Sequence, residues 1–549
     1  MIPICYPIIF VPYIIFMKFK NIAFLFSFQL VFSVVFSQTK APANWFNLDH
    51  KKDKIYGVGA ERSYKDLIKD RKGKPVVVAV IDGGTDTKHE DLKDVIWVNL
   101  NEIPNNGIDD DKNGYIDDIN GWNFIGGKNG KNVEQDNLEV TRVYAKLKSK
   151  YDKADTNKLS ESAKLEYYNY QSAKDVFYKG KQESDLYSNL YASLEKGLEN
   201  LRKNIDTKPI VFDQIVQYKP QNSGEKMAKQ FVLGFVGKKT SVNDSVPFCT
   251  YIFEIISGKE HFEKQANYSY NTELDTRKIV GDNYFDASEK HYGNNNVIGP
   301  NAGHGTHVAG IIAAVRNNNI GINGVANNVK IMVVRVVPDG DERDKDVANG
   351  IMYAVNNGAT IINMSFGKAF SFNKKIVDDA VKYAMSKDVL IVHAAGNDSK
   401  NNDTVDNFPT PYFDNNKERA SGWIEVGASS WEKGKQLAAT FSNFGVKTVD
   451  VFAPGVAIYS TTPDSKYAEY DGTSMAAPVT AGVAALIRSY YPQLSAVQVR
   501  DIIMKSSSKI CRKVYVPGQT KTKTKLKNLC ASGGIVNAYE ALKLAASYR

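Results

Sequence analysis

Residues 76–84 read VVVAVIDGG, an apolar and largely β-branched run that ends at Asp82 and a pair of glycines. Such a run is typical of a strand that is buried on both faces of a parallel sheet. Downstream, similar short runs alternate with segments of helical periodicity. We expect further strands at 330–337, 361–365, 389–394, 424–428 and 449–452, and helices at 308–315, 345–356, 375–386, 473–490 and 496–507. This alternation predicts an α/β fold, a doubly wound and mostly parallel sheet with helices on both faces.

Three segments of the chain carry an acid, a base and a nucleophile. Asp82 ends the first strand, His304 lies in NAGHGTHVAGIIAA (301–314), and Ser474 lies in YDGTSMAAPVTAGVAALI (470–487). A serine hydroxyl becomes an effective nucleophile when an imidazole takes its proton, and a carboxylate fixes the tautomer of that imidazole. Sites in open α/β sheets lie at the carboxyl ends of strands, which is where Asp82 falls. The sequence therefore predicts nucleophilic catalysis by Asp82, His304 and Ser474.

The order Asp, His, Ser and the local sequence around each of these residues resemble those of the subtilisin-like serine peptidases. The resemblance implies a subtilisin-like fold, with His304 as the general base and the second histidine, His307, as a structural residue. One departure is Gly83, where most relatives carry Ser or Thr after the aspartate. A hydroxyl that could hydrogen-bond Asp82 is therefore missing, but every member of the predicted triad is present.

The same resemblance implies further site residues in two short segments. Asn397, in HAAGNDS (393–399), would aim its amide at the tetrahedral intermediate beside the backbone N–H of Ser474, completing an oxyanion hole. The substrate-binding edges would be two tripeptides, one of which binds the peptide as an added strand: Ser365, Phe366, Gly367 and Ala394, Ala395, Gly396. Because the wall contains small residues, we expect the pocket between the edges to admit a sizeable apolar side chain.

An acidic loop is a candidate cation site. Residues 109–118 read DDDKNGYIDD and place oxygen donors at alternate positions around a glycine, as calcium loops do, although the terminal Glu is absent. The predicted ligands are Asp109, Asp111, Asn113, Tyr115 and Asp117. An acidic turn that binds no metal is the alternative.

A second candidate calcium site follows from the resemblance alone. Asp91 and the loop 315–322 (VRNNNIGI) resemble the ligands of a stabilising site in subtilisins, with Asn317 or Asn318 supplying the amide. The loop has one extra residue, so the register stays open. We expect calcium to be structural and catalysis to need no cofactor.

The chain divides into four segments. Residues 1–37 read as a secretory signal, with Met17 as a possible true start or an unusually long export signal as the alternative. Residues 38–130 and 289–549 form the peptidase domain, and 131–288 form an insertion between Asp82 and His304. Leucines at helical spacing in 186–201 predict an amphipathic helical hairpin within 135–205, or alternatively a partner-binding arm. Short alternating runs in 208–282, such as 231–236 and 251–256, predict a small sheet.

Charge, hydropathy and cysteine content indicate which partners and covalent links to expect. The net charge is +9, but the two signs are interspersed, and the basic run KTKTKLK at 521–527 contains no aromatic residue, so we expect no nucleic-acid partner. No later segment is apolar for long enough to anchor the mature chain in a membrane. Cys511 and Cys530 flank a loop in a chain with an export signal, which predicts a disulfide between them.

These features together predict an exported bacterial serine endopeptidase that hydrolyses peptide bonds in protein and peptide substrates. Periplasm and medium are both open as its location, and so is its oligomeric state. The alternative function is a calcium-stabilised binding or scaffold protein in which the insertion blocks or regulates a weak site.

Overall fold

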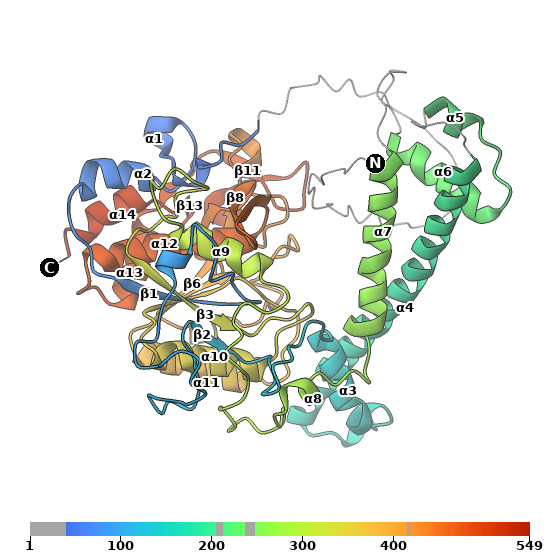
Figure 1. Ribbon diagram of the computed structural model, residues 1–549, viewed down its shortest axis with the longest axis horizontal. Helices are drawn as coiled ribbons and strands as arrows, with labels where there is room; N and C mark the ends of the chain where they lie inside the picture. The colour runs from blue at the N-terminus through green and yellow to red at the C-terminus, as the bar shows by residue number, and fades with distance from the viewer. Residues whose placement is uncertain (1–39, 205–211, 237–247, 414–417, 549) are drawn as a thin grey trace.

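The computed structural model describes residues 40–204, 212–236, 248–413 and 418–548, so the predicted signal segment lies outside the described residues. A nine-stranded sheet occupies the centre, in the order β10-β13-β7-β6-β5-β4-β1-β3-β2 (Figure 1). Its described pairings are parallel except that of β10 with β13. The strands are β1 (Val76–Asp82), β2 (Gly121–Asn123), β3 (Val329–Arg335), β4 (Ile361–Met364), β5 (Leu390–Ala394), β6 (Trp423–Ser429), β7 (Val451–Pro454), β10 (Ser508–Lys509) and β13 (Gly534–Ile535).

Helices cover both faces of this sheet. Successive side chains of each strand point to opposite faces, so each strand contributes apolar residues to the layers on both sides. Val78 and Val80 of β1 pack in the apolar cluster of α9, α12, α13 and α14, whereas Ala79 and Ile81 pack in the cluster of α10 and α11. The bounds are α9 (Gly303–Ala313), α10 (Asp344–Asn356), α11 (Lys374–Ser386), α12 (Thr473–Tyr490), α13 (Ala496–Ser506) and α14 (Ala538–Ala545). The predicted fold class is therefore confirmed.

The remaining elements of this domain are short. They are α1 (His50–Asp53), α2 (Ala60–Ser63), and the antiparallel pairs β8 (Ile458–Thr462) with β9 (Lys466–Tyr470) and β11 (Lys513–Tyr515) with β12 (Lys523–Lys525). Strands of two or three residues, such as β2 and β13, carry no periodicity, which is why the sequence did not predict them.

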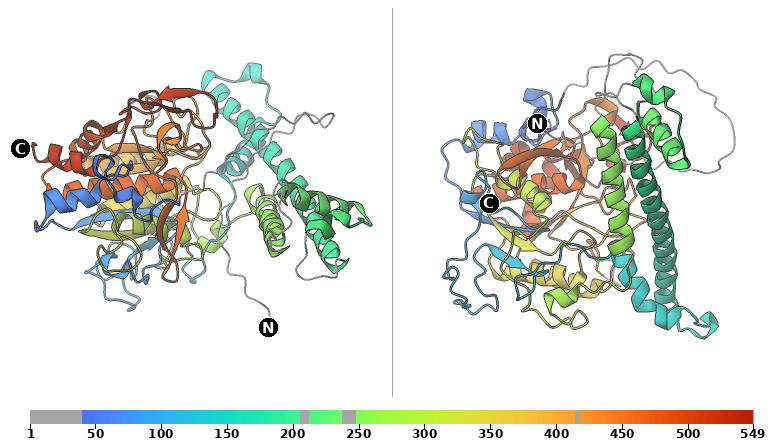
Figure 2. Two further views of the ribbon diagram at one scale, coloured as in Figure 1. Left: turned by 90° about the horizontal axis from the view of Figure 1, so that it is seen from above. Right: turned by 45° about the vertical axis from the view of Figure 1, so that its right-hand side comes forward.

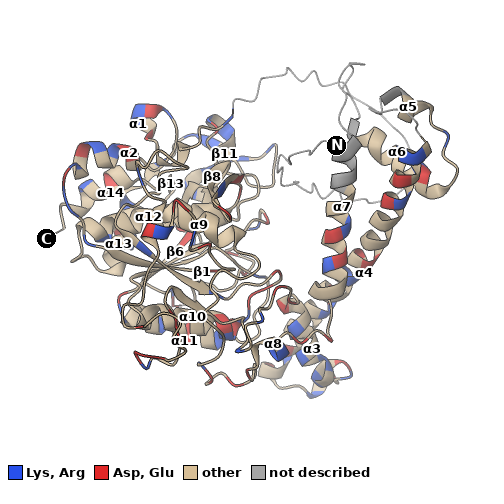
Figure 3. Ribbon diagram, in the orientation of Figure 1, with Lys and Arg blue, Asp and Glu red and all other residues tan. Residues whose placement is uncertain are grey.

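The insertion is helical and stands beside the sheet domain, as Figures 1 and 2 show for α4, α6 and α7. Its first part consists of α3 (Glu139–Tyr151) and α4 (Glu161–Asn204), which confirms the prediction of a helical excursion at 135–205. Of the leucines at helical spacing in 186–201, Leu194, Leu198 and Leu201 are buried, whereas Leu186 is exposed. Basic and acidic residues both occur along α4 and α7 (Figure 3).

The small sheet predicted within 208–282 was wrong. The described residues there form α5 (Phe212–Gln217), α6 (Ser223–Val236), α7 (Phe248–Lys264) and α8 (Arg277–Val280). Short apolar runs fit a buried helix as well as a strand, and here α6 and α7 both pack on α4. Val232 of α6 and Ile255 of α7 are buried in one cluster with Leu194 and Leu198 of α4. The long helix therefore supplies the apolar surface that these runs cover.

The predicted disulfide is absent, because Cys511 and Cys530 are both free. Cys511 is exposed, whereas Cys530 is buried with Ile510 and Leu529. Burial raises the pKa of the Cys530 thiol to about 11. Two cysteines at the ends of a loop do not determine which way their side chains point, and here one faces solvent and the other the core. In the described part of the chain, no helix combines the length and the apolar character needed to cross a membrane.

Candidate active site

The carboxyl end of β1 brings Asp82 to His304. Both carboxylate oxygens of Asp82 lie 2.9 Å from His304 Nδ1. The N–H of Gly83 donates to Asp82 Oδ1 at 2.7 Å, so a backbone donor binds the carboxylate beside the position where a hydroxyl is missing. A Cβ at Gly305 would lie 2.2 Å from the carbonyl oxygen of Gly84, so only glycine lets the first turn of α9 approach the strand this closely.

The environment of His304 favours its charged form. Partial burial alone lowers the pKa of the imidazole, but the charge of Asp82 and its hydrogen bond outweigh this effect and raise the pKa above its ordinary value. Since Nδ1–H donates to Asp82, the lone pair of the neutral ring is on Nε2, and 41% of the side chain is exposed to the cleft. His307 behaves differently, because it is buried and hydrogen-bonds the carbonyl of Ala468, and burial lowers its pKa to about 3.

Ser474 lies in the first turn of α12, next to the residues that follow β4. Its hydroxyl donates to the carbonyl oxygen of Ser365 at 2.9 Å, and the hydroxyl of Ser365 donates to the carbonyl of Ser474 at 2.8 Å. The described interactions include no hydrogen bond between Ser474 and His304. The structure therefore brings Asp82 and His304 into contact but holds the serine hydroxyl on Ser365.

Two hydrogen-bond donors, the Asn397 amide and the Ser474 N–H, lie near Gly472. Asn397 Oδ1 accepts bonds from the Thr473 N–H at 2.9 Å and the Thr473 hydroxyl at 3.0 Å, which leaves its Nδ2 as the outward donor. That Nδ2 and the backbone nitrogen of Ser474 lie 3.7 and 3.5 Å from the point that a Cβ on Gly472 would occupy. The N–H of Ser474 has no intrahelical acceptor, because it belongs to the first turn. Both donors therefore lie close to Gly472.

The two predicted substrate edges end neighbouring parallel strands. Residues 365–367 follow β4 and residues 394–396 end β5 and continue past it. A cleft of about 350 Å³ lies along the first edge and is lined by Asp82, His304, Ser365 and Phe366. Gly396 N donates to the Thr473 hydroxyl at 3.1 Å, which ties the second edge to the start of α12.

Asn407, which the sequence did not single out, lies between these edges. Its Nδ2 donates to the Ala394 carbonyl at 3.2 Å, and its Oδ1 lies 2.6 Å from where a Cβ on Gly367 would be. Its Cγ lies 3.5 Å from the corresponding point on Gly396. The gap between the edges is thus occupied by an amide, although the edges themselves consist mostly of small residues.

The acidic loop brings together part of the predicted ligand set. One carboxylate oxygen from each of Glu102, Asp109 and Asp111 lies within 4.8 Å of the others, so this cluster could hold a metal ion. Asp117 is turned away and accepts the N–H groups of Asn106 and Gly107. The other predicted ligands are also engaged: Asn113 donates its amide to Asp111 and Asp118, and the Tyr115 ring is buried against Trp122. Glu102 lies seven residues before Asp109, outside the loop pattern, and so gave no signal.

The second candidate cation site does bring Asp91 and Asn318 together. Asn318 Nδ2 donates to Asp91 Oδ1 at 2.7 Å, while its amide oxygen accepts the N–H of Ile320. Asn317 was the alternative, and it is Asn318 that contacts the carboxylate. Burial raises the pKa of Asp91. Calcium needs oxygen ligands, and here the amide presents nitrogen to the site, so this pair fits a cation less well than the loop cluster.

Comparisons with known proteins place the chain in one family. The sequence model described as "Subtilase family" matches residues 73–533. Subtilisin DY of Bacillus licheniformis is 36% identical over 240 residues, 43% of this chain and 80% of that protein. Thermitase of Thermoactinomyces vulgaris is 42% identical over 209 residues, 38% of this chain and 68% of that protein.

Alkaline elastase YaB of Bacillus sp. (strain YaB) is 39% identical over 209 residues, 38% of this chain, and the match spans half of the length of that relative. The family match covers most of the chain, including both the strand that ends at Asp82 and the helix that begins beside Ser474. The chain therefore belongs to the subtilase family of subtilisin-like serine peptidases.

Proposed function

We propose that this protein is a serine endopeptidase in which Ser474 attacks the peptide carbonyl, His304 takes the hydroxyl proton and later gives it to the leaving amine, and Asp82 orients the imidazole. The observation that carries the proposal is the Asp82–His304 contact at 2.9 Å, which leaves Nε2 as a base facing the cleft. For attack, the Ser474 hydroxyl rotates from the Ser365 carbonyl toward Nε2. Catalytic hydrogen bonds are often long or misaligned before substrate binds, so this rotation is part of the proposed step.

Asn397 is proposed as one donor of the oxyanion hole, with the Ser474 N–H as the other. Both donors lie near Gly472, and we infer that the carbonyl oxygen of a peptide attacked by Ser474 would gain its negative charge between them. Thr473 supports this role, because its two bonds to Asn397 Oδ1 fix the amide with nitrogen outward.

The substrate peptide is proposed to lie along residues 365–367, with the side chain before the scissile bond between Gly367 and residues 394–396. Asn407 limits the room there, since its amide contacts both edges. We infer that the pocket accepts small side chains rather than the sizeable apolar ones that the edge residues alone suggest.

Digestion of casein, with products identified by mass spectrometry, tests both the activity and this preference. We expect cleavage at internal bonds, mainly after small residues such as Ala. Replacing Asn407 with Gly removes the amide, and cleavage after Leu or Phe relative to Ala should rise about tenfold. Asn407→Gln, which keeps the amide on a longer side chain, is the matched control and should not widen the preference. An unchanged pattern in Asn407→Gly would show that Asn407 does not line the pocket, and the absence of any internal cleavage would contradict the activity itself.

The domain boundaries are proposed as in the sequence, with 38–130 and 289–549 as the peptidase domain and 131–288 as the insertion. The positively charged and apolar residues before Gln38 support export from a bacterial cell, in keeping with the bacterial sources of the relatives. The proposed substrates are proteins and peptides.

Calcium is proposed as a structural ion at the cluster of Glu102, Asp109 and Asp111. Three converging carboxylate oxygens suit a hard cation, and their mutual repulsion is relieved when one binds. Asp109 also accepts the N–H groups of Asn113 and Gly114, so its carboxylate is held in place. The Asp91–Asn318 pair stays a prediction.

Calcium is expected to raise the melting temperature more than the turnover number. A ligand that binds only the folded state adds about 2.7 kcal/mol at a hundredfold excess over its Kd. For a chain of this size, that corresponds to roughly 3 °C in a calorimetric scan. The gain should be lost in Asp109→Asn and kept in Asp110→Asn, whose carboxylate bonds Ile103 and Asn106 outside the cluster. Equal protection by magnesium at the same ionic strength, or no effect of a chelator, would mean that the loop is only an acidic turn.

A further inference from the structure

A groove continues from the first substrate edge onto the insertion. A cavity of about 250 Å³ is lined both by Gly367 and Asn407, which bound the proposed side-chain pocket, and by insertion residues, among them Leu138, Val140 and Val176. A larger hollow of about 1110 Å³ follows, between the first half of α4 and the loops 369–371 and 405–408. The two share Ala369, Phe370 and Asp406, so they form one path that leads away from Ser365. We call this path the α4 groove.

One face of α4 lies open along this groove. Tyr170, Ala173 and Phe177 of α4 are buried in the cluster with α3 and lie on another side of the helix. Three of the residues of α4 that line the groove are apolar and exposed: Leu165 is 74% exposed, Tyr168 65% and Val176 43%. Polar residues of α4, such as Glu166 and Ser172, line it between them. Val405, on the facing loop, is 43% exposed. Exposed apolar side chains that line a hollow in this way are typical of a binding surface.

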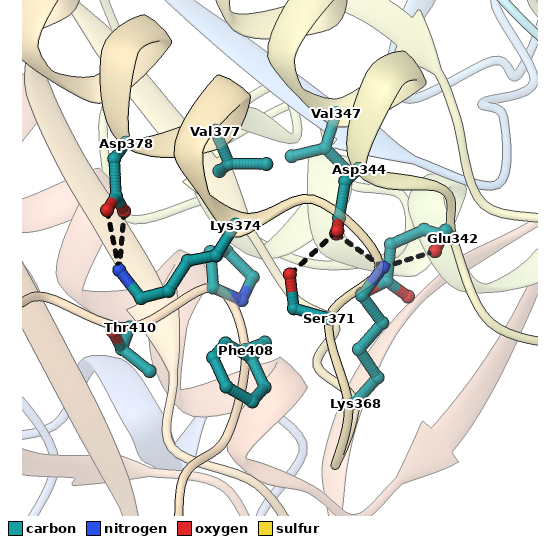
Figure 4. Close-up of a pocket in the computed structure, with 11 residues that line it drawn as sticks. Glu342, Asp344, Val347, Lys368, Ser371, Lys374, Val377, Asp378, Phe408 and Thr410 are labelled. Atoms are coloured by element: carbon teal, nitrogen blue, oxygen red, sulfur yellow. Dashed lines mark hydrogen bonds and ion pairs between the residues drawn. The ribbon is translucent and has the colours of Figure 1, made fainter. Parts of the chain in front are cut away.

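Buried ion pairs hold this wall against the substrate edge. Lys368, the residue after Gly367, places Nζ 2.9 Å from Glu139 of α3 and 2.7 Å from Asp344 of α10. Figure 4 shows this amine between Asp344 and Glu342, whose carbonyl it also binds. Lys368 and Glu139 are both almost fully buried, and losing one partner of such a pair is strongly destabilising.

Two further contacts make the same connection. Arg142 of α3 donates to the carbonyl oxygens of Asp341 and Glu342, which precede α10. Phe370 and Phe372, beyond the substrate edge, pack on the cluster between α3 and α4. The insertion is therefore joined to the segment that extends the substrate edge, and the groove is preformed.

We propose that the α4 groove binds the polypeptide substrate itself, at residues that precede those on the catalytic edge. The proposal rests on the proposed peptidase function and deepens it, because it makes the insertion a substrate-binding element for extended, apolar chain segments. Continuity with the edge at Ser365–Gly367 favours this occupant. Ser365 and Ala369 are four positions apart, about 13 Å in an extended chain, so the larger hollow, which Ala369 lines, begins roughly four residues before the scissile bond.

The test compares two fluorescent peptides with the same sequence around the cleaved bond. The short peptide begins three residues before that bond, and the long one carries five more residues, two of them Leu. Against wild type we set the double variant Leu165→Ser/Tyr168→Ser and the control Leu186→Ser. Leu186 is 65% exposed on the same helix but does not line the groove. Both substituted sites are exposed, so the fold should tolerate them.

Wild type should cleave the long peptide with a kcat/KM about tenfold above that of the short one. The double variant should lower this long-to-short ratio close to one, mainly through KM, while Leu186→Ser keeps it. Equal kcat/KM for both peptides in wild type, or an unaltered ratio in the double variant, would overturn the proposal. So would a concentration-dependent dimer that the double variant abolishes, because a second copy would then cover the groove.

A measurement of peptide binding tests the groove independently of the peptidase function. Fluorescence anisotropy with full-length protein carrying Ser474→Ala should give a Kd about tenfold lower for the long peptide, and the Leu165→Ser/Tyr168→Ser changes should remove the difference. If this length dependence is found but wild type cleaves neither peptide, the groove stands and the peptidase function fails. If both peptides are cleaved but bind equally, the peptidase function stands and the groove proposal fails.

Discussion

Replacing Ser474 with Ala is expected to lower the turnover number by a factor on the order of 10⁶, because the hydroxyl is the proposed nucleophile and triad members act as a unit. The substitution removes one oxygen at the start of α12, and the only described bond of that hydroxyl is to the Ser365 carbonyl. The measurement is the initial rate on casein or a peptide substrate.

The fold should survive this change. Circular dichroism and the melting temperature serve as the control, and both should match wild type within the small effect of losing one hydrogen bond. A Ser474→Ala protein that cleaves casein at a near-native rate would contradict the assignment of Ser474.

Asp82→Asn is expected to lower kcat by about 10⁴, because the amide can present N–H to His304 Nδ1 and hold the imidazole in the wrong tautomer. It should also move the pH profile. Asp82 raises the pKa of His304 against the lowering effect of burial, and His304 must be neutral to act as base. Wild-type kcat/KM therefore rises with pH through this raised pKa.

In Asp82→Asn the charge is gone and burial remains, so the pKa of His304 should fall. The rise of kcat/KM with pH, which is the acid limb of the profile, should therefore occur at lower pH. A plot of kcat/KM against pH for both proteins measures the shift. A residual activity with an unmoved acid limb would show that the titrating group is not His304 paired with Asp82.

Much of the fold was predictable because the long strands and helices have clear periodicity. The run at 76–82 and the helix at 473–490 each have one pattern and one structure, and both predictions hold. The prediction of strands at 231–236 and 251–256 was wrong for the opposite reason. These runs are short and apolar, and the helix that they pack on, α4, lies far away in the sequence.

The site was predictable where local motifs fix it and not where distant loops meet. The contact of Asp82 with His304 follows from the ends of β1 and the start of α9. Asn407 and Glu102 belong to no motif, and only the folded chain shows that Asn407 fills the gap between the edges and that Glu102 joins Asp109 and Asp111. The direction of the Ser474 hydroxyl was also beyond sequence, because it depends on a single side-chain rotation.

The central claim is that Ser474 is a nucleophile activated by His304. A fluorophosphonate probe reacts covalently with such a serine, so labelling followed by peptide mapping tests the claim in one step. The account predicts stoichiometric labelling at Ser474 in the wild-type protein, and loss of that label in His304→Ala although the hydroxyl is still present. No labelling of folded wild-type protein, or labelling at a different serine, would contradict it.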